Sequence, residues 1–357
     1  MADDSHPAHL SPSELGTKDY WETFYARTLS HLSTKHTTAT TTTTTTTKPT
    51  PNPNTESSSE DEDEEDDIDD DSDPGTSWFS EHNAPDKVLQ FLTDEEFPLA
   101  PVNTNTNNSK DGDEQQAPSI LDLGTGNGSM LALLRKRGGY KGVMVGIDYS
   151  IRSVQLAREL QRLRIHSAYL SDSEDEGDED EVGKEGSGDG GDTNIRFEEW
   201  DILHGDVYET TTTTSEEESG DGERKKGKVD WFPYDKGGFD IVLDKGTFDA
   251  VSLSDEVIPT SDGAEGHASG KTIQRRVCER YPGIVRGLVR KGGFVVVTSC
   301  NWTEEELVAW FTRADSTSSG GDGEEDKFVV WGRVEYPRFR FGGREGQGVC
   351  TVCFQRV

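Results

Sequence analysis

The sequence predicts an α/β domain with a mainly parallel sheet and helices on both of its faces. Strand and helix patterns alternate along the chain, the first strand ends in a turn with three glycines, and the last two strand patterns suggest a hairpin. Such alternation is typical of parallel sheets, in which helices connect successive strands. The closing hairpin would add one antiparallel strand.

The first two strands and helices follow one another closely. SILDLGTG (119–126) is a short apolar run that ends in glycines, which predicts a buried strand, and SMLALLRKRG (129–138) predicts the helix after it. GVMVGIDYS (142–150) predicts the second strand. The helix expected over 150–164 begins at Ser150, whose hydroxyl suits an N-cap.

Three more strands and two more helices are expected before the hairpin. One helix is predicted over 271–293, where Pro282 marks an irregularity or the first turn. The other is predicted over 303–313, where Thr303 and Glu306 have the spacing of a capping box. The strands are predicted over 195–203, over 239–253 with an end at Asp244, and over 292–302.

The predicted hairpin consists of RVEYPRFRF (333–341) and GVCTVCFQRV (348–357), on either side of the glycine-rich 342–348. Cys350 and Cys353 lie three residues apart on its second strand, so they point to opposite faces and are not expected to share a metal. No second cysteine pair or histidine cluster in the sequence suggests a metal site. We expect all four thiols to be reduced and buried.

The formal net charge of −34 comes from low-complexity stretches rather than from the predicted core. These stretches hold 42 of the 70 acidic residues but 8 of the 36 basic ones, which leaves the rest of the chain neutral. We expect disordered, solvated insertions in a single domain over 1–357, with about 220 residues left for its core; alternatively, one of them docks a basic partner. The six insertions are predicted at 33–75, 100–117, 171–193, 209–228, 254–270 and 314–326.

Neither a membrane protein nor a secreted protein is expected. No stretch approaches the roughly 20 apolar residues of a membrane span. The first ten residues, MADDSHPAHL, are acidic and lack the apolar centre of a signal peptide. We expect a monomer in the cytoplasm that is also found in the nucleus.

The stretch DLGTGNG, residues 122–128, restricts the function most. Gly124, Gly126 and Gly128 have the spacing G-x-G-x-G rather than the G-x-G-x-x-G of dinucleotide folds, and the chain has no G-x-x-x-x-G-K-[ST] phosphate loop. A turn that only packs a strand on a helix is the simplest alternative. The second alternative is that the turn binds a methyl donor, which has no pyrophosphate and therefore does not need the dinucleotide spacing.

Four carboxylates near the ends of the first four strands favour a ligand site over simple packing. Asp122 precedes the glycine turn, and Asp148 ends the second strand, where it can accept from both hydroxyls of a ribose. Asp201 ends the third strand, where it can accept from an adenine amino group beside Ile202. Asp244 ends the fourth strand. Each alone could be a surface acid or a helix cap, but together they fit S-adenosylmethionine better than a nicotinamide dinucleotide.

Methyl transfer from a sulfonium chiefly needs a well-placed, deprotonated acceptor. For a lysine acceptor, Asp244 or a nearby acid could hold the ammonium, while aromatic walls exclude water and attract a methylated ammonium. The motif DKGT at 244–247 differs from the Asn/Asp-Pro-Pro-aromatic motif of enzymes that methylate base or glutamine nitrogens, and the neutral core argues against nucleic acid. The aromatic candidates, each of which could instead pack in the core, are Trp21, Tyr25, Trp78, Phe79, Phe248 and Trp302.

These motifs resemble those of the seven-stranded S-adenosylmethionine-dependent methyltransferases. More closely, the chain resembles the protein-lysine methyltransferases of the EFM4 and METTL10 branch, which act on translation elongation factor 1-alpha. LDKGTFDA together with TSCNWT is specific to this branch, whereas the glycine motif alone is not. The matching stretches, spread over nearly all of the predicted core, are SELGTKDYWETFYARTL (13–29), LDLGTGNGSML, GIDYS, LDKGTFDAVSL, VVVTSCNWTEEEL and FGGREGQGVCTVCFQRV.

The resemblance implies a Rossmann-like sheet of seven strands, S-adenosylmethionine as the methyl donor and a lysine of elongation factor 1-alpha as the acceptor. We expect Asp244 and Lys245 to be catalytic. The same donor site could instead serve another protein or a small molecule, and a non-enzymatic module that interacts through its acidic runs is a third alternative, which the full set of donor carboxylates disfavours. The expected donor-binding residues are Trp21, Asp122, Gly124, Gly126, Gly128, Asp148, Asp201 and Ile202.

Overall fold

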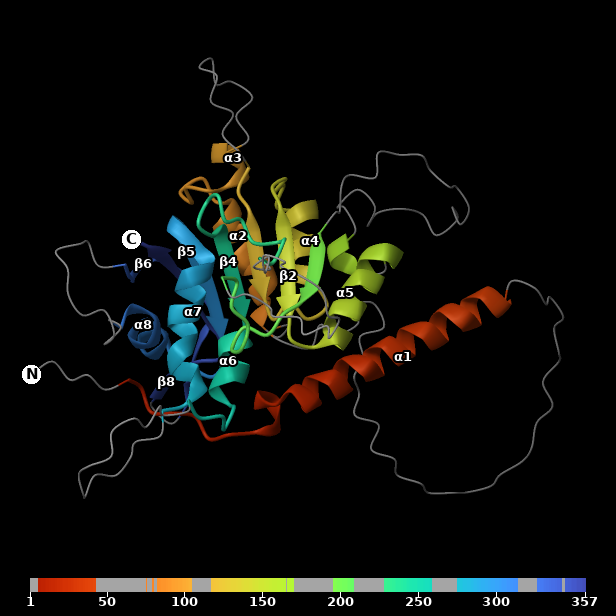
Figure 1. The fold of residues 1–357 in the computed structure, drawn as a ribbon, viewed down its shortest axis with the longest axis horizontal. Coiled ribbons are helices and arrows are strands. Elements are labelled where there is room, and N and C mark those ends of the chain that lie inside the picture. Colours follow the sequence, from red (N-terminus) through yellow and green to blue (C-terminus); the bar gives the residue numbers. More distant parts are fainter. Residues whose placement is uncertain are drawn as a thin grey trace, which may run out of the picture.

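The structure is a computed structural model of the chain (Figure 1). It describes residues 6–42, 75, 79, 82–104, 117–164, 166–169, 195–208, 228–258, 275–313, 326–341 and 344–357. In the part of the chain that it describes, no helix is both long enough and apolar enough to cross a membrane.

The described residues form a seven-stranded sheet with the strand order β3-β2-β1-β4-β5-β9-β6. Strands β1 to β5 run parallel, and β9 lies antiparallel between β5 and β6. The predicted fold class, a mostly parallel sheet with one antiparallel strand, is therefore confirmed. The bounds are β1 Ile120–Leu123, β2 Met144–Asp148, β3 Arg196–Glu199, β4 Phe239–Lys245, β5 Val289–Ser299, β6 Phe328–Val334 and β9 Cys350–Arg356.

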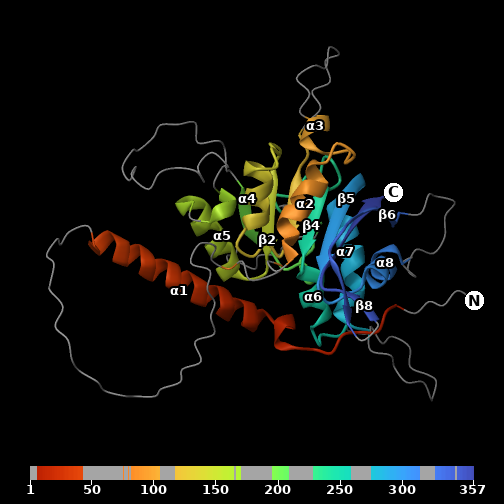
Figure 2. The same cartoon turned by 180° about the vertical axis from the view of Figure 1, so that it is seen from behind.

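Helices cover both faces of this sheet, as predicted (Figures 1 and 2). Successive strand residues point to opposite faces, so β1 places Ile120 in one buried cluster and Leu121 in the other. Helices α1, α2, α4 and α5 contribute to the first cluster, and α6, α7 and α8 to the second. The bounds are α1 Lys18–Thr42, α2 Ala84–Thr93, α3 Pro101–Thr104, α4 Ser129–Lys136, α5 Ile151–Leu163, α6 Thr247–Ser252, α7 Tyr281–Leu288 and α8 Glu304–Thr312, with 3-10 helices at η1 Glu14–Gly16, η3 Ser167–Tyr169 and η4 Val277–Arg280.

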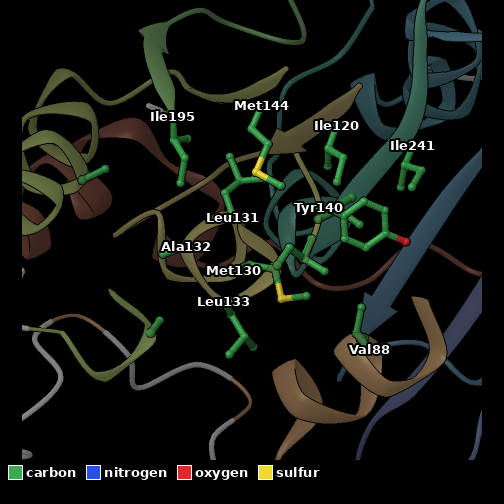
Figure 3. Packing of buried hydrophobic residues seen from close by; sticks show 14 of the residues in the cluster. Val88, Ile120, Met130, Leu131, Ala132, Leu133, Tyr140, Met144, Ile195 and Ile241 are labelled. Carbon is green, nitrogen blue, oxygen red and sulfur yellow. The ribbon is translucent and has the colours of Figure 1, made fainter. Parts of the chain in front are cut away.

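The packing of α4 on the sheet holds the glycine turn in place. Met130 and Leu131 of α4 lie near Ile120 and Met144 of the neighbouring strands (Figure 3), and Leu131 is completely buried. Full burial of one such side chain stabilises a fold by about 1.5–3 kcal/mol. The turn between β1 and α4 is therefore anchored at both ends.

The helix caps that the sequence predicts are present. The hydroxyl of Ser150 accepts from the N–H of Ser153 at 3.2 Å and caps α5. Thr303 and Glu306 form the expected capping box of α8. Pro282 lies in the first turn of α7, and the helical part of 271–293 is limited to η4 and α7 because Val289 already begins β5.

The predicted terminal hairpin is wrong in detail. Strand β9 pairs with β6, which begins at Phe328, before the predicted range. The glycine-rich segment is not simply a loop, because β8 (Arg344–Gln347) pairs within a separate two-stranded sheet with β7 (Arg338–Phe341). Among the described residues, β6 has β9 as its single strand neighbour, and most residues of β6 are half-buried. The sequence of β6 therefore carries a weaker apolar signal than that of a central strand.

Several predicted boundaries also differ from the structure. Helix α1 continues to Thr42, inside the predicted insertion 33–75, and α3 lies inside 100–117. Val257, inside 254–270, forms an isolated bridge with Arg276. The remaining parts of the six predicted insertions fall mostly outside the described residues.

The prediction of four buried thiols is wrong for one of them. Cys278, Cys350 and Cys353 are buried, whereas Cys300 is exposed. Cys300 directly follows β5 at the carboxyl edge of the sheet, where the chain leaves the core.

Candidate functional site

A cavity lies at the carboxyl ends of β1, β2 and β4, beside the segment that follows β3. It encloses about 1240 Å³ when its open mouth is included. The strand order reverses between β1 and β4, and open α/β sheets bind ligands at such a switch point. The cavity is therefore where the fold predicts a ligand.

The glycine turn forms one wall of the cavity. Gly124 and Gly126 line it with φ of +56° and +58°, a region that favours glycine. A Cβ on Gly124 would lie 2.4 Å from Oγ1 of Thr247, and one on Gly126 would lie 3.0 Å from the hydroxyl of Tyr25. Both positions therefore require glycine for the close approach of α6 and α1.

Gly128 has a different role from the first two glycines. It does not line the cavity, and a Cβ there would lie 2.6 Å from Cζ of Phe197 on β3. With φ of +76°, it precedes the first residue of α4. Its position supports close packing of α4 on the sheet rather than contact with a ligand.

The carboxylate of Asp148 holds the glycine turn against the start of α5. Its oxygens accept from the N–H of Gly126 at 3.1 Å, the N–H of Ser150 at 2.9 Å and the hydroxyl of Ser153 at 2.7 Å. Burial raises the pKa of Asp148 to about 6, although these hydrogen bonds oppose the shift. Asp148 lines the cavity, so it is a fixed acceptor at the end of β2.

Asp201 lies two residues after the end of β3 and lines the cavity beside Trp200 and Ile202. Its Oδ1 accepts from the N–H of Leu203 at 2.9 Å, and its Oδ2 lies 3.0 Å from Nδ1 of His204. Asp201 is partly exposed, so it can still accept from a ligand at the open side of the cavity.

His204 links Asp201 to the segment that follows α6. Its Nε2 lies 2.7 Å from Oε1 of Glu256. The hydrogen bond to Glu256, and then the one to Asp201, raise the pKa of His204. Because its side chain is mostly exposed, this ion pair adds little stability.

Asp122 and Lys245 form a buried pair of opposite charges beneath the glycine turn. Asp122 is paired in register with Leu243 on β4, so Lys245 projects to the same face of the sheet as Asp122. Burial raises the pKa of Asp122 to about 6, against the 2.8 Å hydrogen bond from Thr125 and the charge of Lys245. Burial lowers the pKa of Lys245, against the charges of Asp122 and Asp244. Lys245 lines the cavity and Asp122 does not.

Asp244 lies on the opposite face of β4 and caps the helix that follows. Its Oδ1 accepts from the N–H groups of Thr247 at 2.9 Å and Phe248 at 3.1 Å, and its Oδ2 accepts from the hydroxyl of Tyr281 at 2.7 Å. Burial raises its pKa to about 7. Asp244 is 1 % exposed and is absent from the cavity lining.

The sequence predicted that Asp244 would contact the acceptor, but Asp249 on α6 is the residue of this motif that lines the cavity. Its Oδ1 accepts from the hydroxyl of Ser299 at 2.5 Å, and its Oδ2 accepts from the N–H of Cys300 at 2.8 Å. Burial raises the pKa of Asp249. The only local signal for this residue is its place five positions after Asp244 in the motif DKGTFDA.

The N-terminal segment forms the roof of the cavity, where Leu15, Gly16, Trp21 and Tyr25 line it. A Cβ on Gly16 would lie 2.3 Å from the carbonyl carbon of Leu253, so the two backbones are in direct contact. The roof therefore lies against the end of α6.

Arg276 ties this roof to α6. Its guanidinium donates to the carbonyl of Leu10 at 2.5 Å, to that of Ser252 at 3.1 Å and to that of Ser254. Carbonyl groups from two segments that are distant in the sequence therefore accept hydrogen bonds from the same guanidinium.

A second contact of the N-terminal segment brings His6, His9 and Glu279 within 4.8 Å of one another. Glu279 already accepts from Arg275 and from the N–H of Arg276, both at 2.9 Å. With these donors and a nearby guanidinium, the group is better suited to holding the segment than to binding a cation.

The predicted aromatic residues divide between the cavity and the core. Trp21 and Tyr25 line the cavity. Phe79 packs on Gly246, and Nζ of Lys245 lies 5.7 Å from the centre of its ring. Phe248 and Trp302 stack in the second core cluster at 6.0 Å. Trp78 lies outside the described residues.

Seven of the ten predicted site residues therefore meet around one space, and three lie behind its walls. Asp122, Gly128 and Asp244 are the three that do not line it. They support the turn, the packing of α4 and the cap of α6. The seven that line it are Trp21, Gly124, Gly126, Asp148, Asp201, Ile202 and Lys245.

Comparison with known proteins relates this site to methyltransferases. A family model described as a methyltransferase domain matches residues 114–173, which include the glycine turn and Asp148. Among solved structures, N-methyltransferase NodS from Bradyrhizobium japonicum, in complex with S-adenosyl-l-homocysteine, is 11% identical, with a TM-score of 0.35 over 76% of this chain and 86% of that one.

Curated relatives match the chain over nearly its whole length. Protein-lysine N-methyltransferase EFM4 of Saccharomyces cerevisiae is 29% identical over 97% of this chain and 96% of its own length. EEF1A lysine methyltransferase 2 of Homo sapiens is 24% identical over 97% of this chain and 88% of its own. The resemblance that the motifs predicted is thus confirmed: the chain is similar from end to end to the protein-lysine N-methyltransferases EFM4 and EEF1A lysine methyltransferase 2.

Proposed function

We propose that this protein is an S-adenosylmethionine-dependent protein-lysine N-methyltransferase that modifies translation elongation factor 1-alpha. The observation that carries the proposal is the cavity at the ends of β1 and β2, which gathers the glycine turn, Asp148 and Asp201 in a chain similar over 97% of its length to EFM4. The names of two relatives support elongation factor 1-alpha as the acceptor. One is named protein-lysine N-methyltransferase EFM4, and the other is named EEF1A lysine methyltransferase 2.

The residues of the cavity fit S-adenosylmethionine. Gly124 and Gly126 line the cavity with their backbone, and the absence of a Cβ lets Thr247 and Tyr25 close around the same turn. Asp148 and Asp201 offer carboxylate oxygens suited to ribose hydroxyls and an adenine amino group, while Trp200 and Ile202 offer apolar contacts for the base. No pyrophosphate has to be bound.

When bound, this donor supplies a methyl group already activated by a positive sulfonium. The chain then has to position the acceptor nitrogen and exclude water. Trp21 and Tyr25 of the N-terminal roof lie over the cavity and can shield it from solvent. Lys245 also lines the cavity, and burial lowers its pKa against the charges of Asp122 and Asp244.

Methylation by the purified full-length protein tests this proposal. The protein, labelled S-adenosylmethionine and an extract of cells that lack the protein should yield one labelled band at the mass of elongation factor 1-alpha, with the label on a lysine. Purified elongation factor 1-alpha should accept the label as well. Label only in small molecules or RNA would contradict the proposal, and label only in another protein would favour the alternative substrate.

The location and assembly of the protein belong to the same proposal. We propose a monomer in the cytoplasm and the nucleus that binds its protein substrate without nucleic acid or membrane. An active monomer in light scattering, at the concentration used for methylation, would support this. Activity confined to a larger assembly would contradict it.

A further inference from the structure

Two buried carboxylates lie near the end of the cavity formed by β4, α6 and β5, and they differ in access. Asp249 is among the residues that line the cavity, whereas Asp244 is enclosed between α6 and Tyr281. Asp249 is also 1 % exposed, so a ligand reaches its carboxylate only through the cavity.

Neutral groups hold the carboxylate of Asp249, and no cationic side chain among the described residues pairs with it. The hydroxyl of Ser299 and the N–H of Cys300 donate to it, and the thiol of Cys300 lies 3.4 Å from Oδ2. Among the described residues, no lysine, arginine or histidine forms an ion pair with Asp249. A buried carboxylate without a cation is costly, which makes it a strong binding point for a cation that enters the cavity.

The thiol of Cys300 is the weakest of these partners. A thiol is a weak donor, and Cys300 is exposed and directly precedes Asn301, which lines the cavity. An ammonium that replaced the thiol would exchange a weak neutral contact for a charge-assisted hydrogen bond. The hydrogen bonds from Ser299 and the Cys300 backbone could remain and keep the carboxylate oriented.

The other groups at this end of the cavity define the cation. Ala250, Val251 and Leu253 line the cavity next to Asp249 and give an apolar wall that suits an alkyl chain. Lys245 is the cationic residue of the lining among the described residues, and the negative charges of Asp122 and Asp244 both act on it. The best complement is therefore a primary ammonium on an aliphatic stem.

We propose that Asp249, rather than Asp244, binds and orients the ammonium of the acceptor lysine. The inference rests on the proposed function, since it assigns the acceptor end of the same cavity. Asp244 then acts from behind, as the cap that fixes the start of α6 and so the position of Asp249.

Binding of two donor analogues tests the role of Asp249 without a protein substrate. Sinefungin carries an amine where S-adenosylmethionine carries its methyl group, whereas S-adenosylhomocysteine carries nothing there. Calorimetry should show that the wild type prefers sinefungin, and that Asp249→Asn reduces this preference by about tenfold or more. An amide can keep one of the neutral hydrogen bonds, because its oxygen can accept from the N–H of Cys300. Oγ of Ser299 already accepts from the N–H groups of Asn301 and Trp302, so its contact with the amide is weaker.

Two comparison variants make the result specific. Asp244→Asn and Cys300→Ala should each keep the preference for sinefungin within about threefold, a difference below that of one charged hydrogen bond. A preference that survives Asp249→Asn, or that is lost in Asp244→Asn instead, would overturn the inference. Thermal unfolding of Asp249→Asn checks that the variant is folded, and Asp249→Glu gives a second variant that keeps the charge.

Steady-state kinetics separate this inference from the proposed function. With elongation factor 1-alpha, Asp249→Asn should lower kcat/KM by about 100-fold while the affinity for S-adenosylhomocysteine changes less than about threefold. If the wild type does not methylate elongation factor 1-alpha but its preference for sinefungin depends on Asp249, the proposed substrate is wrong and the ammonium site stands.

Discussion

The two ends of the cavity are built on different principles. At the donor end, the carboxylate of Asp148 is fixed by backbone N–H groups of Gly126 and Ser150 that lie within 22 residues of it along the chain. At the acceptor end, Asp249 is fixed by Ser299 and Cys300, 50 and 51 residues away. The donor end is thus a product of local backbone geometry, and the acceptor end depends on how α6 meets β5.

This difference teaches which changes each end tolerates. The donor end has little freedom in its backbone, because positive φ angles and close contacts leave no room for a Cβ. The acceptor end is sensitive to charge, because a carboxylate there has no cation among the described residues to balance it. Substitutions that add a side chain should therefore disrupt the donor end, and substitutions that remove a charge should disrupt the acceptor end.

The largest effect is expected from a methyl group at the donor end. Gly124→Ala places a Cβ 2.4 Å from Oγ1 of Thr247 at a φ of +56°. The left-handed conformation and the contact together should lower the free energy of unfolding by about 2–3 kcal/mol. The affinity for S-adenosylhomocysteine should fall by at least about tenfold, which calorimetry would measure, since a shift of about 1.4 kcal/mol suffices.

Gly287→Ala is the matched control for this change. Gly287 lies in the last turn of α7, and among the described residues a Cβ there would meet no atom within 4 Å beyond its chain neighbours and the backbone of the helix itself. Alanine is favoured over glycine in a helix by about 1 kcal/mol, so this variant should be slightly more stable and bind the donor normally. If Gly124→Ala and Gly287→Ala had the same stability and the same donor affinity, the backbone of the donor end would tolerate a Cβ, against our expectation.

The same contrast explains how much the sequence could predict. The N-caps at Ser150 and Thr303 were predictable because each depends on a neighbour three residues away. The glycines of the turn were predictable from their spacing, in accord with their positive φ angles, although the side chains that they approach are distant in the sequence. Asp249 was missed because its partners lie 50 residues away and no local spacing reports them. The partners of Asp244 are partly local, at Thr247 and Phe248, and the possibility of a helix cap followed from them.

A moderate effect is expected from pH at the donor end. Burial raises the pKa of Asp148 to about 6, so acidification through pH 6 protonates it and removes an acceptor from the cavity. The affinity for S-adenosylhomocysteine should therefore fall by about tenfold for each pH unit below the pKa. In Asp148→Asn, the affinity should be lower at neutral pH and should depend less on pH.

Measuring the stability of the fold as a function of pH distinguishes the loss of donor affinity from unfolding of the protein. A carboxylate whose pKa is raised by folding contributes stability that is present below its unfolded pKa and is lost as pH rises through its folded pKa. Protonation of Asp148 should therefore favour the fold while it weakens donor binding. Parallel losses of affinity and of stability on acidification would contradict the assignment of Asp148.

Asp244→Asn should change how stability depends on pH rather than how the donor binds. The pKa of Asp244 is raised from 3.8 to about 7 by burial, so its contribution to stability is lost between about pH 4 and pH 7 as pH rises. Asparagine caps helices about as well as aspartate and carries no charge. The urea midpoint of the variant should therefore fall less than that of the wild type over this range, and identical slopes would show that folding does not raise the pKa of Asp244.

The contact between Arg276 and Leu10 has a consequence for the order in which the protein is made. Leu10 leaves the ribosome well before Arg276, whose side chain holds its carbonyl and lies 266 residues later. The first residues of the chain therefore have to wait for most of the others before they can close the cavity. A nascent chain that stops before Arg276 can already contain the glycine turn and Asp148, yet it lacks the anchor that secures the roof above them.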